Sequence, residues 1–451
     1  MDTIVALATP PGRSAIGIVR MSGPNSLCIT RTLIGEEKFD PEPAHAILKS
    51  ILDLSTAQLI DKALITYFKS PNSFTSEDIV EISSHGSPVV LRGIVDSILK
   101  LDARLAGPGE FTLRALKNGK INLSEAEAIR DLINAQTDAA ARQAVRQLNG
   151  ELSNRLRPLK DQLVAVIVPL ESALEFVEDD LPALQTERLD SDLSNLIGNI
   201  GRLASTFNSG HLLRSGLKVA IAGPPNAGKS SLFNQLLRCE RAIVTEVPGT
   251  TRDTLSEQII LGGVPITLTD TAGIREAGDR IEKLGVERAQ WAMADANLVL
   301  IVLDGSTDLS DEVVNLLKGS NEHCVIALNK SDLPSYNNRL LAHFNGHSRA
   351  VQVSAKTGAG LEDLCDAIVA TFNLDDANDN GLLVTDARHY DLLCRCQAEL
   401  ESAKTLFEKR ASEELILVGL HNALRFLGAI TGETTTETIL SEIFSTFCIG
   451  K

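Results

Sequence analysis

The sequence predicts a multidomain protein that combines α/β and α+β architecture, with all-α segments on both sides of an inserted α/β domain. Three observations support this. Gly223-Pro-Pro-Asn-Ala-Gly-Lys-Ser230 fits the pattern G-x-x-x-x-G-K-[ST] and follows the apolar run Leu217–Ala222, as a loop after a buried strand should. Short strand-like runs dominate the first part of the chain, and helical patterning precedes and follows the α/β part. We therefore expect domains at residues 1–118, 119–215, 216–378 and 379–451, of which the second and fourth are helical.

The first domain is expected to be α+β. Its strand-like runs are short and apolar, and turn signals at Pro10-Pro-Gly and Gly107-Pro-Gly separate them from other segments. The runs are Thr3–Leu7, Ile16–Arg20, Ala63–Phe68 and Ile79–Ile82.

The helical region is expected to begin at a capping box, with Ser124 as N-cap and Glu127 at position N3. Apolar residues then recur at helical spacing until about Gly210. An acidic linker is expected over Asp375–Gly381, and helical patterning resumes from Ala387 to about Phe447. One helical domain interrupted by the α/β domain explains this order, and two separate bundles are the alternative.

The glycine-rich loop predicts a nucleoside triphosphate as ligand. Its glycines let successive backbone N–H groups point at phosphates, Lys229 adds a positive charge, and the Ser230 hydroxyl suits Mg²⁺. The loop opens a helix, whose N-terminus also favours anions.

A second motif, Asp270-Thr-Ala-Gly273, lies at the end of the apolar strand Ile266–Thr269. It brings a carboxylate and a glycine N–H to the carboxyl end of a strand, where a metal and a γ-phosphate would lie.

Two further motifs indicate that the base is guanine. Asn329-Lys-Ser-Asp332 follows the strand Cys324–Leu328, and an aspartate there accepts hydrogen bonds from both N1 and N2 of guanine. Adenine offers no such pair of donors, so the expected discrimination is about 10⁴-fold. Ser354-Ala-Lys356 follows the strand Ala350–Val353, and its N–H groups suit the guanine O6. The four motifs in this order resemble the translation-factor-like GTPase superfamily.

The segment Thr245–Asp253 lies where a switch segment belongs, and Thr251 is positioned to ligate Mg²⁺. Ile274 follows the second motif, where many regulatory GTPases have a glutamine that orients the attacking water. Asn226 and Glu282 are the two candidates to compensate. Asn226 either helps to hold a monovalent cation or makes a loop-closing hydrogen bond, and Glu282 is either catalytic or a solvated helical glutamate.

Length and composition limit the possibilities further. The chain has 451 residues and a formal net charge of −16, which argues against unaided non-specific binding to nucleic acid. Its seven cysteines are scattered and show no zinc spacing, which favours reduced thiols. We expect a soluble cytoplasmic protein with no membrane association, because no apolar run is long enough to cross a bilayer.

Motifs along the whole chain resemble the tRNA-modification GTPase family called MnmE or TrmE. They include Pro10-Pro-Gly-Arg13, Pro108–Arg114, Gly249–Asp253 and the terminal Cys448-Ile-Gly-Lys451, in addition to the phosphate loop. The resemblance implies an N-terminal folate-binding and dimerisation domain, an all-α domain, and an inserted Ras-like P-loop GTPase domain. It also implies a homodimer, a FAD-containing partner called MnmG or GidA, and tRNA as the substrate of the complex.

The implied reaction adds an aminomethyl or carboxymethylaminomethyl group to C5 of a wobble uridine. The implied cofactors are K⁺, Mg²⁺ and a reduced folate similar to 5-formyl- or methylene-tetrahydrofolate. By motif, K⁺ would be held by Asn226, Thr245, Val247 and Thr250, and Mg²⁺ by Ser230 and Thr251, while Glu282 would position the nucleophilic water.

The full set expected to bind GTP is Asn226, Ala227, Gly228, Lys229, Ser230, Ser231, Thr245, Glu246, Val247, Pro248, Gly249, Thr250, Thr251, Asp270, Thr271, Ala272, Gly273, Asn329, Lys330, Ser331, Asp332, Ser354, Ala355 and Lys356.

The folate site implied by the resemblance consists of Arg20, Glu81, Lys120 and Lys451. A carboxylate such as Glu81 suits paired pterin donors, and bases suit the glutamate tail of folate. The chain departs from the family pattern at Ser87, Gly107 and Asn122, which bears more on this pocket than on the GTPase. For Cys448, a thiol role near the folate and a buried apolar role both remain open.

Two other functions compete with this one. A ribosome-assembly or RNA-associated regulatory GTPase shares the same nucleotide motifs, but it would end in a basic RNA-binding module, and residues 374–451 contain no G-x-x-G loop and several acids. A folate-dependent one-carbon transferase with a regulatory GTPase differs in where the chemistry takes place.

Overall fold

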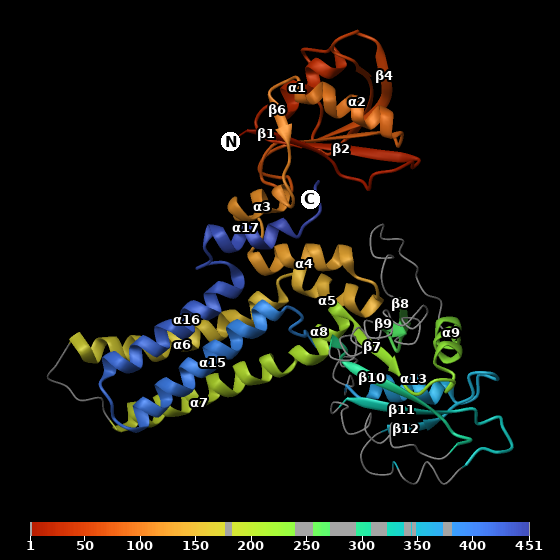
Figure 1. Cartoon of the computed structure of the whole chain (residues 1–451). Coiled ribbons are helices and arrows are strands. Elements are labelled where there is room, and N and C mark those ends of the chain that lie inside the picture. Colours follow the sequence, from red (N-terminus) through yellow and green to blue (C-terminus); the bar gives the residue numbers. More distant parts are fainter. Residues whose placement is uncertain are drawn as a thin grey trace, which may run out of the picture. The chain divides into compact units, whose positions relative to one another are not determined.

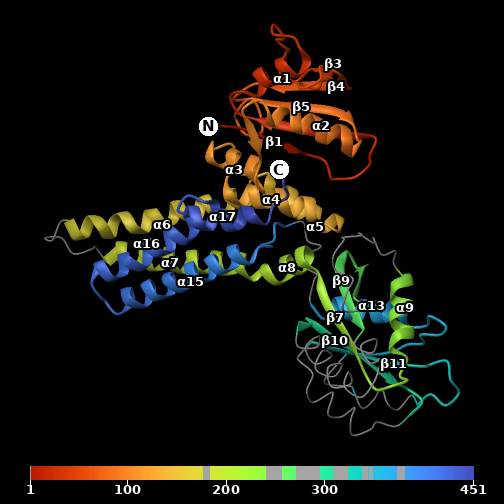
Figure 2. The same ribbon diagram turned by 45° about the horizontal axis from the view of Figure 1, so that its top comes forward.

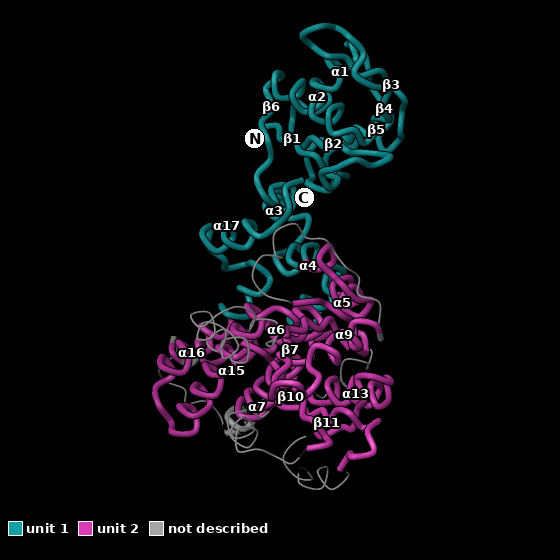
Figure 3. Tube along the Cα trace, turned by 45° about the vertical axis from the view of Figure 1, so that its right-hand side comes forward, with its two compact units in different colours: residues 1–130, 147–157, 425–451 teal, residues 131–146, 158–424 magenta. Residues whose placement is uncertain are grey.

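The computed structural model describes residues 2–175, 183–239, 256–270, 295–307, 323–337, 344, 349–372 and 381–450. Figure 1 shows the course of the chain, and Figure 3 shows its division into two compact units. Unit 1 contains residues 1–130, 147–157 and 425–451, and unit 2 contains residues 131–146 and 158–424. The inserted α/β domain lies within unit 2, and the chain returns to unit 1 after it.

Unit 1 is built on a mixed six-stranded sheet with the strand order β3-β4-β5-β2-β1-β6. Its neighbours pair antiparallel, except that β1 and β6 are parallel. The strands are β1 (Thr3–Leu7), β2 (Ile16–Ser22), β3 (Ala46–Leu52), β4 (Leu59–Phe68), β5 (Ile79–His85) and β6 (Ala103–Leu105).

Helices α1 (Ser26–Ile34) and α2 (Pro88–Leu99) pack against one face of this sheet. Alternate strand residues supply the core beneath them, as in the buried pair Val19 and Met21 of β2. Both helices are visible beside the strands in Figure 2. The four expected strands and the α+β class are therefore confirmed, while β3 and β6 were not predicted.

The carboxyl end of the chain returns to this sheet. Helices α3 (Glu110–Lys117) and α17 (Glu437–Ser445) lie in unit 1, where Phe444 and Phe447 share a core with Leu123 and Ala126. The Gly109 N–H donates to the Cys448 carbonyl at 3.3 Å, and Pro108 and Ile449 form an isolated β-bridge. The last residues of the sequence are thereby brought beside the N-terminal strands.

Helix α4 (Leu123–Asn134) is capped two residues earlier than the sequence predicts. Asn122 Oδ1 accepts the Glu125 N–H at 3.0 Å, and Glu125 Oε2 accepts the Asn122 N–H at 3.0 Å. This is a capping box with Asn122 as N-cap and Glu125 at N3. The predicted box at Ser124 and Glu127 is wrong, because Leu123 must enter the first turn to reach its buried position among the phenylalanines.

Unit 2 contains a second six-stranded sheet, with the strand order β12-β11-β10-β7-β9-β8. All neighbours are parallel except β8, which pairs antiparallel with β9 at the edge. The strands are β7 (Leu217–Ala222), β8 (Ser256–Leu261), β9 (Val264–Asp270), β10 (Leu298–Asp304), β11 (Cys324–Asn329) and β12 (Arg349–Gln352). The carboxyl ends of β7, β9 and β11 carry three of the predicted motifs.

The central strands of the unit 2 sheet are buried, as is usual for a parallel sheet, whose two faces are covered by other elements. Its strands β10 and β11 are almost entirely inaccessible to solvent, and helices α9 (Lys229–Cys239) and α13 (Leu361–Ala370) contribute to the core around it. We refer to the sheet with these helices as the G domain.

Helices before and after the G domain pack on each other. The other helices in the described part of the chain are α5 (Asp138–Leu148), α6 (Glu151–Glu175), α7 (Ala183–Ser205), α8 (Phe207–Ser215), α15 (Ala387–Glu408) and α16 (Glu413–Thr431). Helix α7 precedes the G domain and runs along α15, which follows it (Figure 1). This contact favours one interrupted helical domain over two separate bundles. Helix α8 continues five residues past Gly210, where the sequence predicted the helices to end, and the predicted boundaries at 118, 215 and 378 stay predictions.

Helix α16 is long and apolar enough, by length and composition, to cross a membrane. Its buried residues include Ile416, Leu420, Ala423, Leu427 and Ile430, which recur at helical spacing. At Gly419 the helix lies close to the Glu399 carbonyl and the Ala403 side chain of α15. Burial of one face therefore accounts for part of its apolar composition, whereas Leu415 and Val418 on the same helix are 57% and 61% exposed. The expected linker from Asp375 to Asn380 lies outside the described residues.

Candidate functional site

The phosphate loop connects β7 to α9, and the backbone of this connection requires glycine at two positions. Gly223 has φ +146°, and a Cβ added there would lie 2.1 Å from the Val302 carbonyl oxygen. Gly228 has φ +95°, and a Cβ there would lie 2.2 Å from Asn329 Nδ2. Any larger residue would therefore clash with β10 or with the Asn329 side chain at the end of β11.

Lys229 begins α9 and is 8% exposed. Its Nζ donates to the Gly223 carbonyl at 2.9 Å and to the Pro224 carbonyl at 2.8 Å. The ammonium is thereby held against the loop whose N–H groups would bind phosphate oxygens. A positive charge and a helix N-terminus lie together, which is the arrangement that anions favour.

Ser230 and Asp270 bring two oxygen atoms together from different elements. The Ser230 hydroxyl, in the first turn of α9, donates to Asp270 Oδ2 at the end of β9 over 3.0 Å. Asp270 is buried, with 3% of its surface exposed. Hydroxyl and carboxylate oxygens are ligands that suit Mg²⁺. The described donor set therefore fits this metal, although Thr251 lies outside the described residues.

Asn329 connects the phosphate loop to the base-recognition loops. Its Nδ2 donates to the Ala227 carbonyl at 2.8 Å, and its Oδ1 accepts the Ala355 N–H at 2.9 Å. The residue is 2% exposed, so both bonds are shielded from water. One amide side chain therefore links three of the four sequence motifs.

Asp332 is exposed and positioned by a hydrogen bond. The Ser354 hydroxyl donates to Asp332 Oδ1 at 2.7 Å, and the Thr357 N–H donates to the Ser354 hydroxyl at 3.2 Å. The carboxylate is thus oriented by the neighbouring motif, and the residue is accessible to solvent. This arrangement is suited to accepting two donors from a purine edge.

Lys330 is held by an acid that sequence reasoning did not single out. Its Nζ donates to Asp304 Oδ2 at 2.6 Å, and its backbone has φ +64°. Burial acts to raise the pKa of Asp304, but hydrogen bonds from Lys330 and Ser306 outweigh it and hold that pKa below its ordinary value. Asp304 is the last residue of β10, which lies next to β11 in the sheet. Its position at the carboxyl end of a parallel strand is the sequence feature that could have identified it as a site residue.

Asn226 lies in the phosphate loop with φ +63°, and it is exposed. Within the described part of the chain, its side chain makes no hydrogen bond that closes the loop. The other residues assigned to the switch segments and to catalysis lie outside the described residues. They are Thr245, Glu246, Val247, Pro248, Gly249, Thr250, Thr251, Thr271, Ala272, Gly273 and Glu282.

The sheet of unit 1 brings two of the residues assigned to folate together. Arg20 and Glu81 are cross-strand partners on β2 and β5, and Arg20 Nε and Nη2 both lie within 2.8 Å of Glu81 Oε1. Arg20 Nη1 also donates to the Gly450 carbonyl at 3.4 Å. The carboxyl end of the chain, described as far as Gly450, therefore lies beside Arg20.

The remaining two residues assigned to folate are not joined to this pair. Lys120 is exposed just after α3, and no contact within the described part of the chain connects its side chain to Arg20 or Glu81. Lys451 lies outside the described residues.

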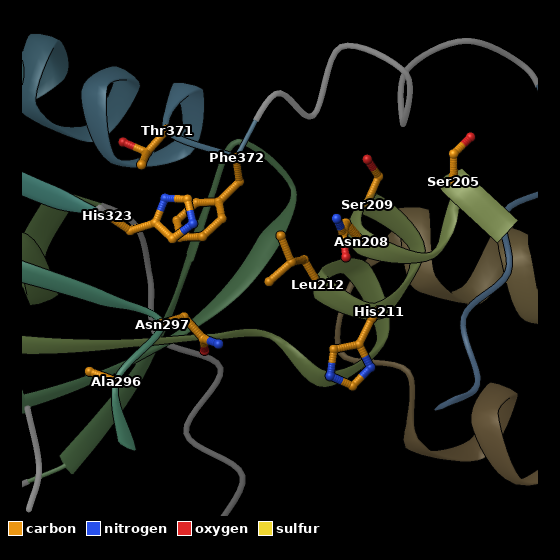
Figure 4. Close-up of a pocket in the computed structure, with 10 residues that line it drawn as sticks. All are labelled: Ser205, Asn208, Ser209, His211, Leu212, Ala296, Asn297, His323, Thr371 and Phe372. Atoms are coloured by element: carbon orange, nitrogen blue, oxygen red, sulfur yellow. The ribbon is translucent and has the colours of Figure 1, made fainter. Parts of the chain in front are cut away.

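A cavity of about 630 Å³ lies at the opposite ends of the G-domain strands, away from the nucleotide motifs. Figure 4 shows its lining, in which one wall comes from α7 and α8 and the other from the G domain. The lining residues are Ser205, Asn208, Ser209, His211, Leu212, Ala296, Asn297, His323, Thr371 and Phe372. None of the predicted site residues lines it.

The parallel sheet, the loop at Gly223 to Ser230 and the base-recognition loops define a P-loop GTPase. Comparison with known proteins agrees with this class. The family described as the MnmE helical domain matches residues 123–448, and the family described as the GTP-binding protein TrmE N-terminus matches residues 3–120.

Two full-length relatives are called tRNA modification GTPase MnmE. The protein from Koribacter versatilis is 41% identical over 100% of this chain and 99% of its own length. The protein from Aquifex aeolicus is 42% identical over 100% of both chains. The chain belongs to the MnmE family of tRNA modification GTPases, and it is a GTP hydrolase that acts in tRNA modification.

Proposed function

We propose that this GTPase depends on potassium and works with a FAD-containing MnmG partner in the cytoplasm. Together they add an aminomethyl or carboxymethylaminomethyl group to C5 of the wobble uridine in certain tRNAs, with a one-carbon unit from a reduced folate. The observation that carries the potassium dependence is Asn226, whose amide is exposed beside the phosphate loop and closes no loop within the described residues. Family membership favours this function over ribosome assembly.

In the GTPase site, each described residue has a separate task. Lys229 would transfer its hydrogen bonds from the loop carbonyls to the phosphates, and Ser230 and Asp270 would hold Mg²⁺, directly or through water. Asp332 would bind the guanine edge in the orientation set by Ser354. Asn226, with Thr245, Val247 and Thr250, would bind K⁺, and Glu282 would position the water that attacks.

Potassium dependence is tested by GTP turnover of the full chain in KCl and in NaCl at equal ionic strength. We expect turnover at least about 10-fold faster in KCl, because a correctly placed cation stabilises the charge that develops on the transferring phosphoryl group. Asn226→Ala should abolish this difference and leave GDP affinity nearly unchanged. Equal GTP turnover of the natural protein in KCl and in NaCl would show that Asn226 does not bind K⁺ in the way proposed.

Glu282 requires a separate test because its surroundings are not described. Glu282→Ala should bind GTP with unchanged affinity and lose most of its turnover in KCl, since positioning by a general base contributes about 10²–10⁴-fold. A variant with full turnover would assign Glu282 to the solvated surface.

An exposed apolar part of the unit 1 sheet, on the face opposite α1 and α2, supports the proposed homodimer. Helices α1 and α2 cover the other face, whereas Leu48, Leu64 and Ile16 are 61%, 45% and 60% exposed. Leu48 and Leu64 are register partners on β3 and β4, and Ile16 lies on β2. An apolar sheet face of this kind is a suitable subunit interface. Sedimentation velocity should show a dimer for the natural protein and a monomer for Leu64→Asp, and a natural monomer would contradict the proposal.

The folate site would lie at the same sheet, beside Arg20 and Glu81. Arg20 occupies Glu81 Oε1, which leaves Oε2 for a pterin donor, while Lys120 and Lys451 would bind the acidic tail. The decisive experiment for the whole function is mass spectrometry of tRNA nucleosides from cells that lack this protein. Loss of a C5-substituted wobble uridine is expected, and an unchanged nucleoside profile would favour the ribosome-assembly alternative.

A further inference from the structure

The two covalent connections of the G domain meet at one guanidinium. Arg214 lies at the end of α8, just before β7, and Asp386 lies after the G domain at the start of α15. Arg214 Nη1 lies 2.6 Å from Asp386 Oδ2, and Nη2 lies 2.9 Å from Asp131 Oδ1 on α4. The two carboxylates are 11% and 8% exposed, so this contact is shielded from solvent screening. The entry and the exit of the G domain are thereby tied to α4.

The returning segment is also tied to α5 and α8. Gln143 of α5, which is 8% exposed, donates from Nε2 to the Gly381 carbonyl at 3.0 Å and accepts the Leu383 N–H at 3.2 Å. The Val384 N–H donates to the Thr206 hydroxyl at 3.0 Å. At Gly210 a Cβ would lie 2.3 Å from the Val384 carbonyl oxygen, which shows how closely the segment lies on α8. It is therefore held as a fixed strap and not as a free linker.

A third contact reaches the strand that follows the first switch segment. Gln136, between α4 and α5, donates to Gln258 of β8 at 3.1 Å. Residues 245–253 of the predicted switch segment precede β8 in the sequence. Ala139, in the first turn of α5, packs against the hydrophobic cluster that joins the core of the G domain to Leu212, Leu213 and Leu383. The hairpin formed by residues 131–146 therefore contacts the G domain at its entry, at its exit and at the edge strand β8.

Another side of α8 lines a cavity. The cavity of about 630 Å³ separates the first part of α8 from the ends of β10 and β11, with Asn208 and Asn297 on its opposite walls (Figure 4). A displacement of the G domain relative to α8 would deform this cavity easily, because few atoms fill it. The same displacement would strain the polar contacts that residues 131–146 make through Asp131 and Gln136.

We propose that the hairpin of residues 131–146 is the element that transmits the nucleotide state of the G domain to the helices. Gln136 would respond to β8, and the contact of Arg214 with Asp131 and Asp386 would convert a shift of β7 or of the strap into a shift of α4. A coupling of this kind requires contacts that differ between two states, and the Gln136–Gln258 contact involves the strand that follows the predicted switch segment in the sequence.

Hydrogen–deuterium exchange of the full chain tests this proposal. Peptides that cover residues 131–146 are compared with GDP and with GDP, aluminium fluoride and KCl, and peptides of residues 217–231 report nucleotide binding itself. We expect exchange in the hairpin to differ at least about 5-fold between the two states, which is the lower end of ordinary allosteric couplings. In the double variant Gln136→Ala with Asp131→Asn, the hairpin difference should disappear while the response of residues 217–231 remains.

The matched control is Asp295→Asn, which breaks the exposed ion pair with Lys218 in the same unit. It should retain the natural response of the hairpin. If the double variant does not fold, the single variant Gln136→Ala decides the question. Gln136 and its contact are exposed, so this variant should fold, and it should still reduce the response of the hairpin. A natural protein whose hairpin ignores the nucleotide, or a variant that retains the full response, would overturn the proposal.

Discussion

The Asn329 side chain donates to the Ala227 carbonyl over 2.8 Å, and this bond joins the loop that recognises the base to the loop that holds the phosphates. The two residues are 102 positions apart in the sequence. Because Asn329 also accepts the Ala355 N–H, it sets the spacing between three loops that a nucleotide must contact at once. Protein contacts therefore hold the parts of the nucleotide site together.

Removal of this bridge should weaken nucleotide binding. Asn329→Ala loses two shielded hydrogen bonds and leaves the Ala355 N–H without its acceptor, at a cost of about 1–3 kcal/mol for a buried unsatisfied group. We expect the Kd for a fluorescent GDP analogue to rise about 10-fold or more. Asn297→Ala is the control, because Asn297 accepts a hydrogen bond from Lys218 at the opposite end of the strands. Unchanged affinity in Asn329→Ala would show that the bridge is dispensable.

Base specificity should depend on the charge of Asp332. Asp332→Asn offers the purine edge one acceptor and one donor, which matches xanthine and leaves a guanine donor unpaired. GTP kcat/KM should fall about 10³-fold or more, and xanthosine triphosphate should become a substrate. Ser354→Ala keeps the carboxylate but removes the hydroxyl that orients it, so its loss should be smaller. Retained preference for GTP in Asp332→Asn would place base recognition elsewhere.

The proposed folate site makes a prediction about Glu81. Glu81→Gln removes the charge that pairs with Arg20 and replaces one acceptor of pterin donors with an amide. Isothermal titration with 5-formyl-tetrahydrofolate should show affinity at least about 10-fold weaker, while GTP turnover stays unchanged. Glu36→Gln, which breaks the more exposed pair with Lys49 in the same unit, should bind folate normally. Equal folate affinity of the two variants would show that Glu81 does not bind the folate.

Asp386 should stabilise the protein in a pH-dependent manner. Burial acts to raise the pKa of Asp386, but the charges of His389 and Arg214 and a bond from the Arg388 N–H hold that pKa well below 3.8. A lowered pKa means that the carboxylate stabilises the fold above about pH 4 and that this contribution is lost as the pH falls through the folded-state value. Asp386→Asn keeps an N-cap side chain and should destabilise by about 3 kcal/mol at pH 7.

The measurement is the urea midpoint of the helical circular-dichroism transition at pH 7 and at pH 3. The difference between Asp386→Asn and the natural protein should shrink at the lower pH. Asp391→Asn, which breaks an exposed pair with Arg395 one turn away on the same helix, should change the midpoint little at either pH. A constant difference for Asp386→Asn would mean that its charge contributes nothing.

The cysteines should differ in reactivity. Burial, together with the charge of Glu399, raises the pKa of the Cys396 thiol to about 12, whereas Cys28 and Cys448 are exposed. At pH 8 the thiolate fraction of Cys396 should be about 10³-fold smaller than that of an ordinary thiol. Alkylation followed by mass spectrometry should label Cys28 and Cys448 first and Cys396 only in denaturant. Early labelling of Cys396 would show that α15 opens readily.

The sequence by itself determined the class of the G domain and the location of its motifs. Gly223, Asp270 and Asp332 each lie at the carboxyl end of a predicted strand or in the turn that follows it, Lys229 begins the helix after the first of these turns, and these strands are present. The prediction succeeds because the chemistry of each motif is local. A glycine-rich turn after a buried strand points its N–H groups at an anion whatever the rest of the chain does.

Only the tertiary structure decided which distant residues meet. The pairing of Arg20 with Glu81 follows from strand register, and Asn329 reaches Ala227 because β11 and β7 lie on either side of β10. The N-cap of α4 moved from Ser124 to Asn122 because Leu123 had to be buried against residues more than 300 positions away. Sequence patterns specify which groups are available and where each local turn lies, whereas long-range packing selects the partners, since burial depends on residues that local spacing does not include.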